Sequence, residues 1–161
     1  MEDIERIEHA RWILERNIGW IAQAEVKVAV IISLDAAMLS ALAAAYIANN
    51  FKTAWAILLS IACGLVMLGA LISCFMVVKP RVNGPESSYV FFGKVAMKNR
   101  VAFSGDFAKA TPAQFLLDLT DQIHRNAEIA CEKHGWVRLA AMWSFGAGAL
   151  WIPAVALLVK A

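Results

Sequence analysis

The sequence carries little net charge and few cysteines. Its formal charge is +2 over 161 residues, and no basic run is interleaved with aromatic residues, which argues against nucleic-acid binding. The three cysteines are an odd number. Cys63 and Cys74 lie in one apolar run and Cys131 in a polar segment, so the spacing indicates no disulfide framework.

Motifs for catalysis or metal binding are also scarce. Cys131 and His134 form a Cys-x-x-His pair, but a structural zinc site needs a second pair of ligands. The stretch "FFGK" at 91–94 lacks the upstream glycine of a phosphate-binding loop. We therefore expect no catalytic residues, no metal and no resident cofactor, and we do not expect an enzyme.

Apolar residues are abundant instead. They make up 60% of the chain, against about 45–50% in an ordinary soluble domain. A membrane-spanning helix needs about 20 apolar residues, and residues 28–48, 54–78 and 137–159 qualify. The first run lies too far behind the acidic start "MEDIERIEHAR" for a cleaved signal peptide. The fold class predicted is an all-α membrane protein with three transmembrane helices.

Helical patterns also lie outside these spans. Residues 4–24 place apolar side chains on one stripe, which predicts an amphipathic N-terminal helix that runs into the first span. This helix would lie on the inner leaflet or pack on the cytosolic part. "TPAQ" at 111–114 is a helix-start signature, and the helix behind it either ends at Gly135 or continues into the third span.

The segment between the second and third spans is predicted to be a small cytosolic, mostly helical insert. The prolines, glycine and serines of "KPRVNGPESS" at 79–88 predict a loop. The pattern of "YVFFGKVAM" at 89–97 is compatible with a strand or a helix. The predicted division is a cytosolic amphipathic helix, a transmembrane hairpin, a cytosolic ligand-sensing segment and a third transmembrane helix, at 1–26, 27–78, 79–136 and 137–161.

Positive charge predicts the orientation. Of the 15 lysines and arginines, only Lys52 and Lys160 fall on the side of the hairpin turn and the C-terminus. Because loops rich in lysine and arginine stay in the cytosol, the N-terminus should be cytosolic and the C-terminus outside.

One charged residue interrupts the first span. Asp35 lies at a depth where a charge costs at least about 2.5 kcal/mol, roughly 10–12 Å inward from Lys27 at 1.5 Å per residue. The same level holds Ser73 and Ser144, and Arg138 is long enough to reach it. The predicted polar layer of Asp35, Ser73, Arg138 and Ser144 either locks the helices structurally or hydrates when they rearrange.

Small residues repeat at helical spacing around this aspartate and permit close helix approach. They form two stripes, Ser33–Ala37–Ala41 and Ala36–Ser40–Ala44. In a three-span protein such stripes favour contacts between subunits, so a homo-oligomer is expected.

The insert offers a candidate site for a small anionic ligand. Cationic side chains meet phosphate, aromatic rings stack on a base, and amides read its edge. Each of these residues alone is more often a solvated charge or a core aromatic; together they indicate a ligand site. The candidates are Arg81, Phe91, Phe92, Gly93, Lys94, Gln122, Arg125, Asn126 and Lys133.

Three stretches carry a resemblance to a known family. They are "WIAQAEVKVAVIISLDAAML" at 20–39, "FFGKVA" at 91–96 and "DLTDQIHRNAEIACEKHGWVRLA" at 118–140. Together they resemble the transmembrane effectors of the Pycsar anti-phage system. That family has a lysine-aromatic pair before the last span, whereas this chain has Lys133 followed by His134.

The resemblance implies a specific function. A partner cyclase would make cyclic UMP or cyclic CMP, and the effector would bind it on the cytosolic side and disrupt the bacterial inner membrane. Two alternatives remain open from the residues: a membrane effector gated by another nucleotide, and a non-signalling accessory subunit of a membrane complex.

Overall fold

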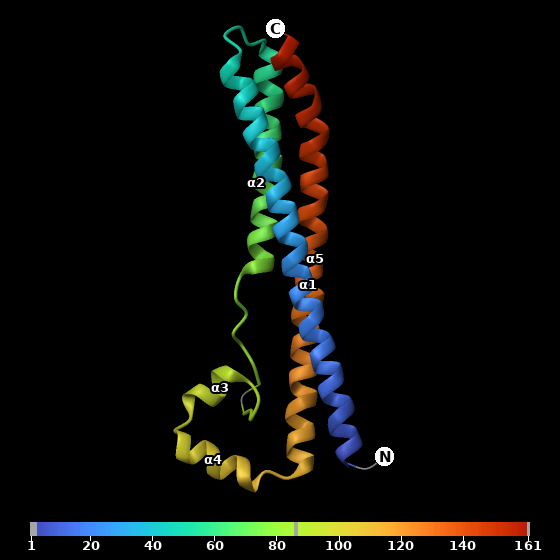
Figure 1. Ribbon diagram of the computed structural model, residues 1–161, viewed down its shortest axis with the longest axis vertical. Helices are drawn as coiled ribbons and strands as arrows, with labels where there is room; N and C mark the ends of the chain where they lie inside the picture. Colours follow the sequence, from blue (N-terminus) through green and yellow to red (C-terminus); the bar gives the residue numbers. More distant parts are fainter. Residues whose placement is uncertain (1–2, 86, 161) are drawn as a thin grey trace. The chain divides into compact units, whose positions relative to one another are not determined.

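A computed structural model describes residues 3–85 and 87–160. Within these residues the chain forms five helices and no strand (Figure 1). They are α1 (Asp3–Ala48), α2 (Ala54–Val78), α3 (Phe92–Met97), α4 (Arg100–Lys109) and α5 (Pro112–Lys160). By length and composition α1, α2 and α5 can each cross a membrane. The prediction of an all-helical chain with three span-length helices is confirmed.

Two of the long helices are continuous: α1 across the junction between the amphipathic segment and the first apolar run, and α5 across Gly135. The amphipathic segment continues into the first apolar run as one 46-residue helix, α1, and α5 extends for 49 residues through Gly135. No glycine among the described residues has a positive φ. Gly135 therefore does not form the left-handed cap that usually ends a helix.

Local caps explain where two of the helices, α4 and α5, begin. At the start of α5, the Thr111 N–H donates to Gln114 Oε1 (2.8 Å) and the Gln114 N–H donates to Thr111 Oγ1 (3.3 Å), the reciprocal pattern of a capping box. The α4 helix was not predicted, although Asn99 Oδ1 accepts from the Val101 N–H at 2.8 Å as its cap. Within the stretch at 89–97, for which a strand and a helix were both open, Phe92–Met97 form helix α3.

The chain divides into two compact units. The insert unit comprises the residues up to Gln23 together with Pro80–Glu132, and the membrane unit comprises Ala24–Lys79 together with the residues from Lys133 onward. Helices α1 and α5 each contribute residues to both.

In the insert unit, the first part of α1 packs against the first part of α5. Asn17, which is 3% exposed, donates from Nδ2 to the carbonyl of Ile123 at 3.0 Å. The buried cluster consists of Ala10, Leu14 and Leu119, with Ile7, Leu116 and Ile123 against it. Of the two placements expected for the amphipathic helix, the structure therefore has packing on the insert.

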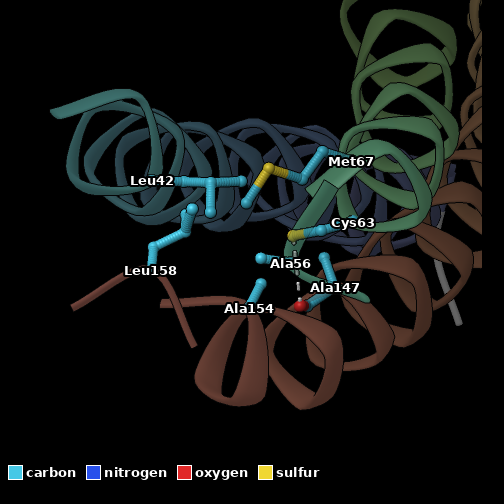
Figure 2. Close-up of a cluster of buried hydrophobic side chains, with 7 residues drawn as sticks. All are labelled: Leu42, Ala56, Cys63, Met67, Ala147, Ala154 and Leu158. Carbon is cyan, nitrogen blue, oxygen red and sulfur yellow. Dashed lines mark hydrogen bonds between the residues drawn. The ribbon is translucent and has the colours of Figure 1, made fainter. Parts of the chain in front are cut away.

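In the membrane unit, α1, α2 and α5 pack side by side through a cluster of buried apolar side chains, both small and large (Figure 2). Cys63 Sγ on α2 donates to the carbonyl of Ala147 on α5 at 3.5 Å. A Cβ added to Gly69 would lie 3.0 Å from the Trp143 ring, so this glycine permits close packing of α2 on α5. The main cluster consists of Leu42, Ala56, Cys63, Met67, Ala147, Ala154 and Leu158.

Candidate functional site

A cavity of about 270 Å³ lies within the insert unit, close to the lower limit of about 300 Å³ for small-molecule pockets. Six of the nine predicted ligand residues line it, and they come from segments far apart in the sequence. These six are Arg81, Phe91, Phe92, Gln122, Arg125 and Asn126, and the wall is completed by Leu14, Ile18, Asn83, Gly84, Val90 and Ile129.

The chain between α2 and α3 is held in place by side chains of α5. Ser88 Oγ, in a residue 3% exposed, accepts from the Phe91 N–H at 2.8 Å and from Gln122 Nε2 at 3.2 Å. One turn away on α5, Asp118 Oδ2 accepts from the Tyr89 N–H at 2.7 Å. These bonds fix the backbone immediately before Phe91, so they position its ring at the cavity.

The Phe91 ring fits between two glycines. A Cβ built on Gly84 would lie 2.5 Å from the ring and one built on Gly93 would lie 2.8 Å away, so a larger residue at either position would displace the ring. Phe92 is adjacent, with its ring centroid 5.0 Å from that of Phe91. Gly93 does not line the cavity, but it makes room for a residue that does.

Both arginines of the cavity wall pair with glutamates. Arg81 donates from Nε and Nη2 to the two carboxylate oxygens of Glu132, at 3.1 and 2.9 Å. Arg125 donates from Nη1 to Glu128 at 3.0 Å and from Nε to the carbonyl of Asn83 at 3.0 Å. The cations that would meet a phosphate therefore already carry carboxylate partners.

The two amides of the wall are also partly used. Gln122 donates from Nε2 to Ser88, and Asn126 donates from Nδ2 to the Gln122 carbonyl at 2.8 Å. In these orientations their side-chain oxygens are left as hydrogen-bond acceptors for a ligand.

The other predicted ligand residues lie elsewhere. Lys94 is half-buried in α3 and, like Gly93, is not part of the cavity wall. Lys133 belongs to the membrane unit, where its side chain is 5% exposed and Nζ pairs with Glu25 Oε1 at 2.5 Å.

Of the predicted polar layer, the structure brings two residues together. Ser144 Oγ on α5 donates to Asp35 Oδ1 on α1 at 2.5 Å. Ser73 Oγ donates instead to the carbonyl of Gly69 in its own helix at 2.8 Å, and Arg138 is exposed.

Asp35 also lines a second cavity, of about 280 Å³, in the membrane unit. The other lining residues are apolar or small: Ile32, Ala36, Leu39, Gly64, Met67, Leu68 and Leu71. The carboxylate thus has one hydroxyl donor and borders an otherwise apolar space, an arrangement that costs free energy in a membrane.

Three helices of span length with a polar pair among them, together with a cavity in the insert unit, indicate a membrane protein with a candidate ligand site. Residues 9–160 match the model of the Pycsar effector protein domain, and the chain therefore belongs to the Pycsar effector family. Comparison with curated proteins and with solved structures found no match. Membership indicates an anti-phage membrane effector, a signalling protein that receives a cyclic nucleotide signal from a cyclase.

Proposed function

We propose that this effector binds cyclic UMP or cyclic CMP in the cavity of the insert unit and, in response, disrupts the bacterial inner membrane. The observation that carries the proposal is the convergence of six predicted ligand residues, from segments at 81–92 and 122–126, on one cavity. The proposed topology is multi-pass, with the N-terminus and the insert in the cytosol.

The cavity offers a partner for each part of such a ligand. Arg81 and Arg125 meet the cyclic phosphate, and the Phe91 ring stacks on the base. The side-chain oxygens of Gln122 and Asn126 accept from the donors on a pyrimidine edge, N3–H of uracil or N4–H₂ of cytosine.

Titration calorimetry of the detergent-purified protein with cyclic UMP, cyclic CMP and cyclic AMP tests the binding. We expect micromolar affinity for one pyrimidine nucleotide and no heat with cyclic AMP. Absence of binding by all three would favour another nucleotide signal or an accessory role in a membrane complex.

In this proposal the transmembrane helices bring about the membrane disruption. In this proposal the Asp35–Ser144 pair is packed in the resting state and becomes hydrated when the helices rearrange. The supporting observation is that Asp35 hydrogen-bonds across two helices and borders a cavity. Liposome leakage tests it: Asp35→Ala that folds and still leaks on addition of ligand would assign Asp35 a structural role only.

Oligomerisation would lower the binding energy that each ligand site has to supply. Shifting the equilibrium between the resting and the active state from 1:99 to 99:1 takes about 5.5 kcal/mol of differential binding, which four equivalent sites share at about 1.4 kcal/mol each. In a single chain both small-residue stripes of α1 are exposed, so these faces are accessible to a second subunit. Light scattering of the detergent complex measures the proposed homo-oligomer, and a monomeric mass contradicts it.

A further inference from the structure

The ion pair between Arg81 and Glu132 joins a cation that is mostly shielded from solvent to an exposed anion. The Arg81 side chain is 11% exposed and the Glu132 side chain 54% exposed, with Nη2 and Oε1 2.9 Å apart. By contrast, Arg125 is 35% exposed and pairs with Glu128 three residues away on the same helix. The Arg81 pair is therefore the more desolvated one on its cationic side, and it connects two distant segments.

This asymmetry decides which partner is replaceable. A guanidinium removed from water needs an anion next to it, whereas a half-exposed carboxylate is readily hydrated when it leaves. A cyclic phosphate offers the same two-oxygen acceptor geometry as a carboxylate, which guanidinium groups bind with two parallel hydrogen bonds.

Resting on the proposed function, we propose that Glu132 is a resident counter-ion on Arg81 that the phosphate of the nucleotide displaces. Ligand binding exchanges one anion on Arg81 for another and releases Glu132 into solvent. The exchange weakens the net affinity for nucleotide, which sets a threshold concentration for a toxic effector.

The exchange also has a mechanical consequence. Arg81 follows the end of α2, at Val78, by three residues, and its partner Glu132 is on α5. Displacement of Glu132 therefore removes a link between α5 and the chain segment that leaves α2.

The variant Glu132→Gln tests this inference, because it removes the charge and keeps the size. We expect calorimetry with cyclic UMP and cyclic CMP to show binding of the ligand that the wild type prefers about tenfold more tightly, the effect of a charge-assisted hydrogen bond. Liposome leakage should then begin at correspondingly lower nucleotide concentration. Asp121→Asn, an exposed carboxylate of the same helix outside the cavity wall, is the matched control and should bind like the wild type.

A second measurement uses the wild type and does not depend on the folding of a variant. Carbodiimide labelling of carboxylates, read by mass spectrometry, should modify Glu132 faster when the nucleotide is saturating, with Asp121 unchanged as internal reference.

The outcomes separate the two proposals. A wild type that binds neither nucleotide overturns the proposed function. A wild type that binds, with Glu132→Gln binding equally or more weakly and no ligand-dependent gain in Glu132 labelling, overturns the counter-ion exchange alone.

Discussion

Helix α5 stabilises each of the two units by a different kind of contact, apolar packing in one and polar bonds in the other. In the membrane unit, α5 presents Ala140, Ala147 and Ala154, all 0% exposed, at intervals of seven residues. In the insert unit, α5 presents Asp118, Arg125 and Glu132 at the same interval. Seven residues are nearly two turns, so each set lies on one face of the helix.

The two faces have different roles. The alanine face lets the helices of the membrane unit pack closely. Because a close-packed interior has little free space, a shift of one helix is transmitted to the helices packed against it. The polar face binds Tyr89, Asn83 and Arg81 in the segment before α3. Polar bonds of this kind exchange with a charged ligand one at a time, which suits a site that must respond to a small molecule.

Overpacking of the alanine face should have the largest effect. Ala147→Leu forces a larger side chain between α2 and α5, and it should destabilise the membrane unit by about 3 kcal/mol. Thermal unfolding in detergent measures the change. Ala149→Leu, at an exposed position two residues away, should leave the unfolding temperature unchanged, and equal effects of the two variants would contradict the packing account.

Removal of one hydroxyl should loosen the insert unit. Ser88→Ala leaves the N–H groups of Val90 and Phe91 and Gln122 Nε2 without their acceptor, at a cost of about 2 kcal/mol. Faster hydrogen exchange at the amides of Val90 and Phe91 should report it. The exposed neighbour Ser87 provides the control: if Ser87→Ala accelerates exchange as much, Ser88 does not anchor this segment.

A methyl group at Gly84 should disturb the ligand site without unfolding it. Gly84→Ala pushes the Phe91 ring, and we expect the affinity for the pyrimidine nucleotide to fall about fivefold, or about 1 kcal/mol. Gly105→Ala, where an added Cβ meets nothing within 4 Å, should not change calorimetric binding. Unchanged affinity in Gly84→Ala would mean that the ring does not contact the base.

The smallest effect concerns a surface ion pair. Lys98 Nζ lies 2.9 Å from Asp106 Oδ2; this hydrogen bond lowers the pKa of Asp106 and raises the pKa of Lys98. The pair therefore contributes most between about pH 4 and pH 10.5, and loses its contribution as pH falls through the lowered aspartate pKa or rises through the raised lysine pKa. In Lys98→Met, an NMR titration should return the Asp106 pKa toward the usual aspartate range, and an unchanged value would rule out the pair.

Local signals were sufficient for most of the fold. The apolar runs located α2 and the spanning parts of α1 and α5, and the Thr111–Gln114 box located the start of α5. The α4 helix was missed because its composition is mixed and Asn99 is its main signal. Six of the nine ligand candidates line one cavity, and their role in ligand binding stays a prediction.

The rest of the site depends on contacts between distant segments. Ser88, Asp118 and Glu132 were missed because their roles come from partners 29 to 51 residues away. The interval of seven between Asp118, Arg125 and Glu132 was the available signal. Lys133 follows Glu132 directly, so it points about 100° around the helix and pairs with Glu25 in the membrane unit.

Ultraviolet cross-linking of radiolabelled cyclic UMP and cyclic CMP to the wild-type protein, followed by tryptic mapping, tests the central claim most directly. Pyrimidines couple to aromatic side chains in contact with them, and Phe91 and Phe92 share the tryptic peptide of residues 82–94. We predict that label from one of the two nucleotides concentrates in that peptide and is removed by excess unlabelled ligand. Label confined to peptides of the membrane unit, or no displaceable label at all, would contradict a pyrimidine nucleotide site in the insert.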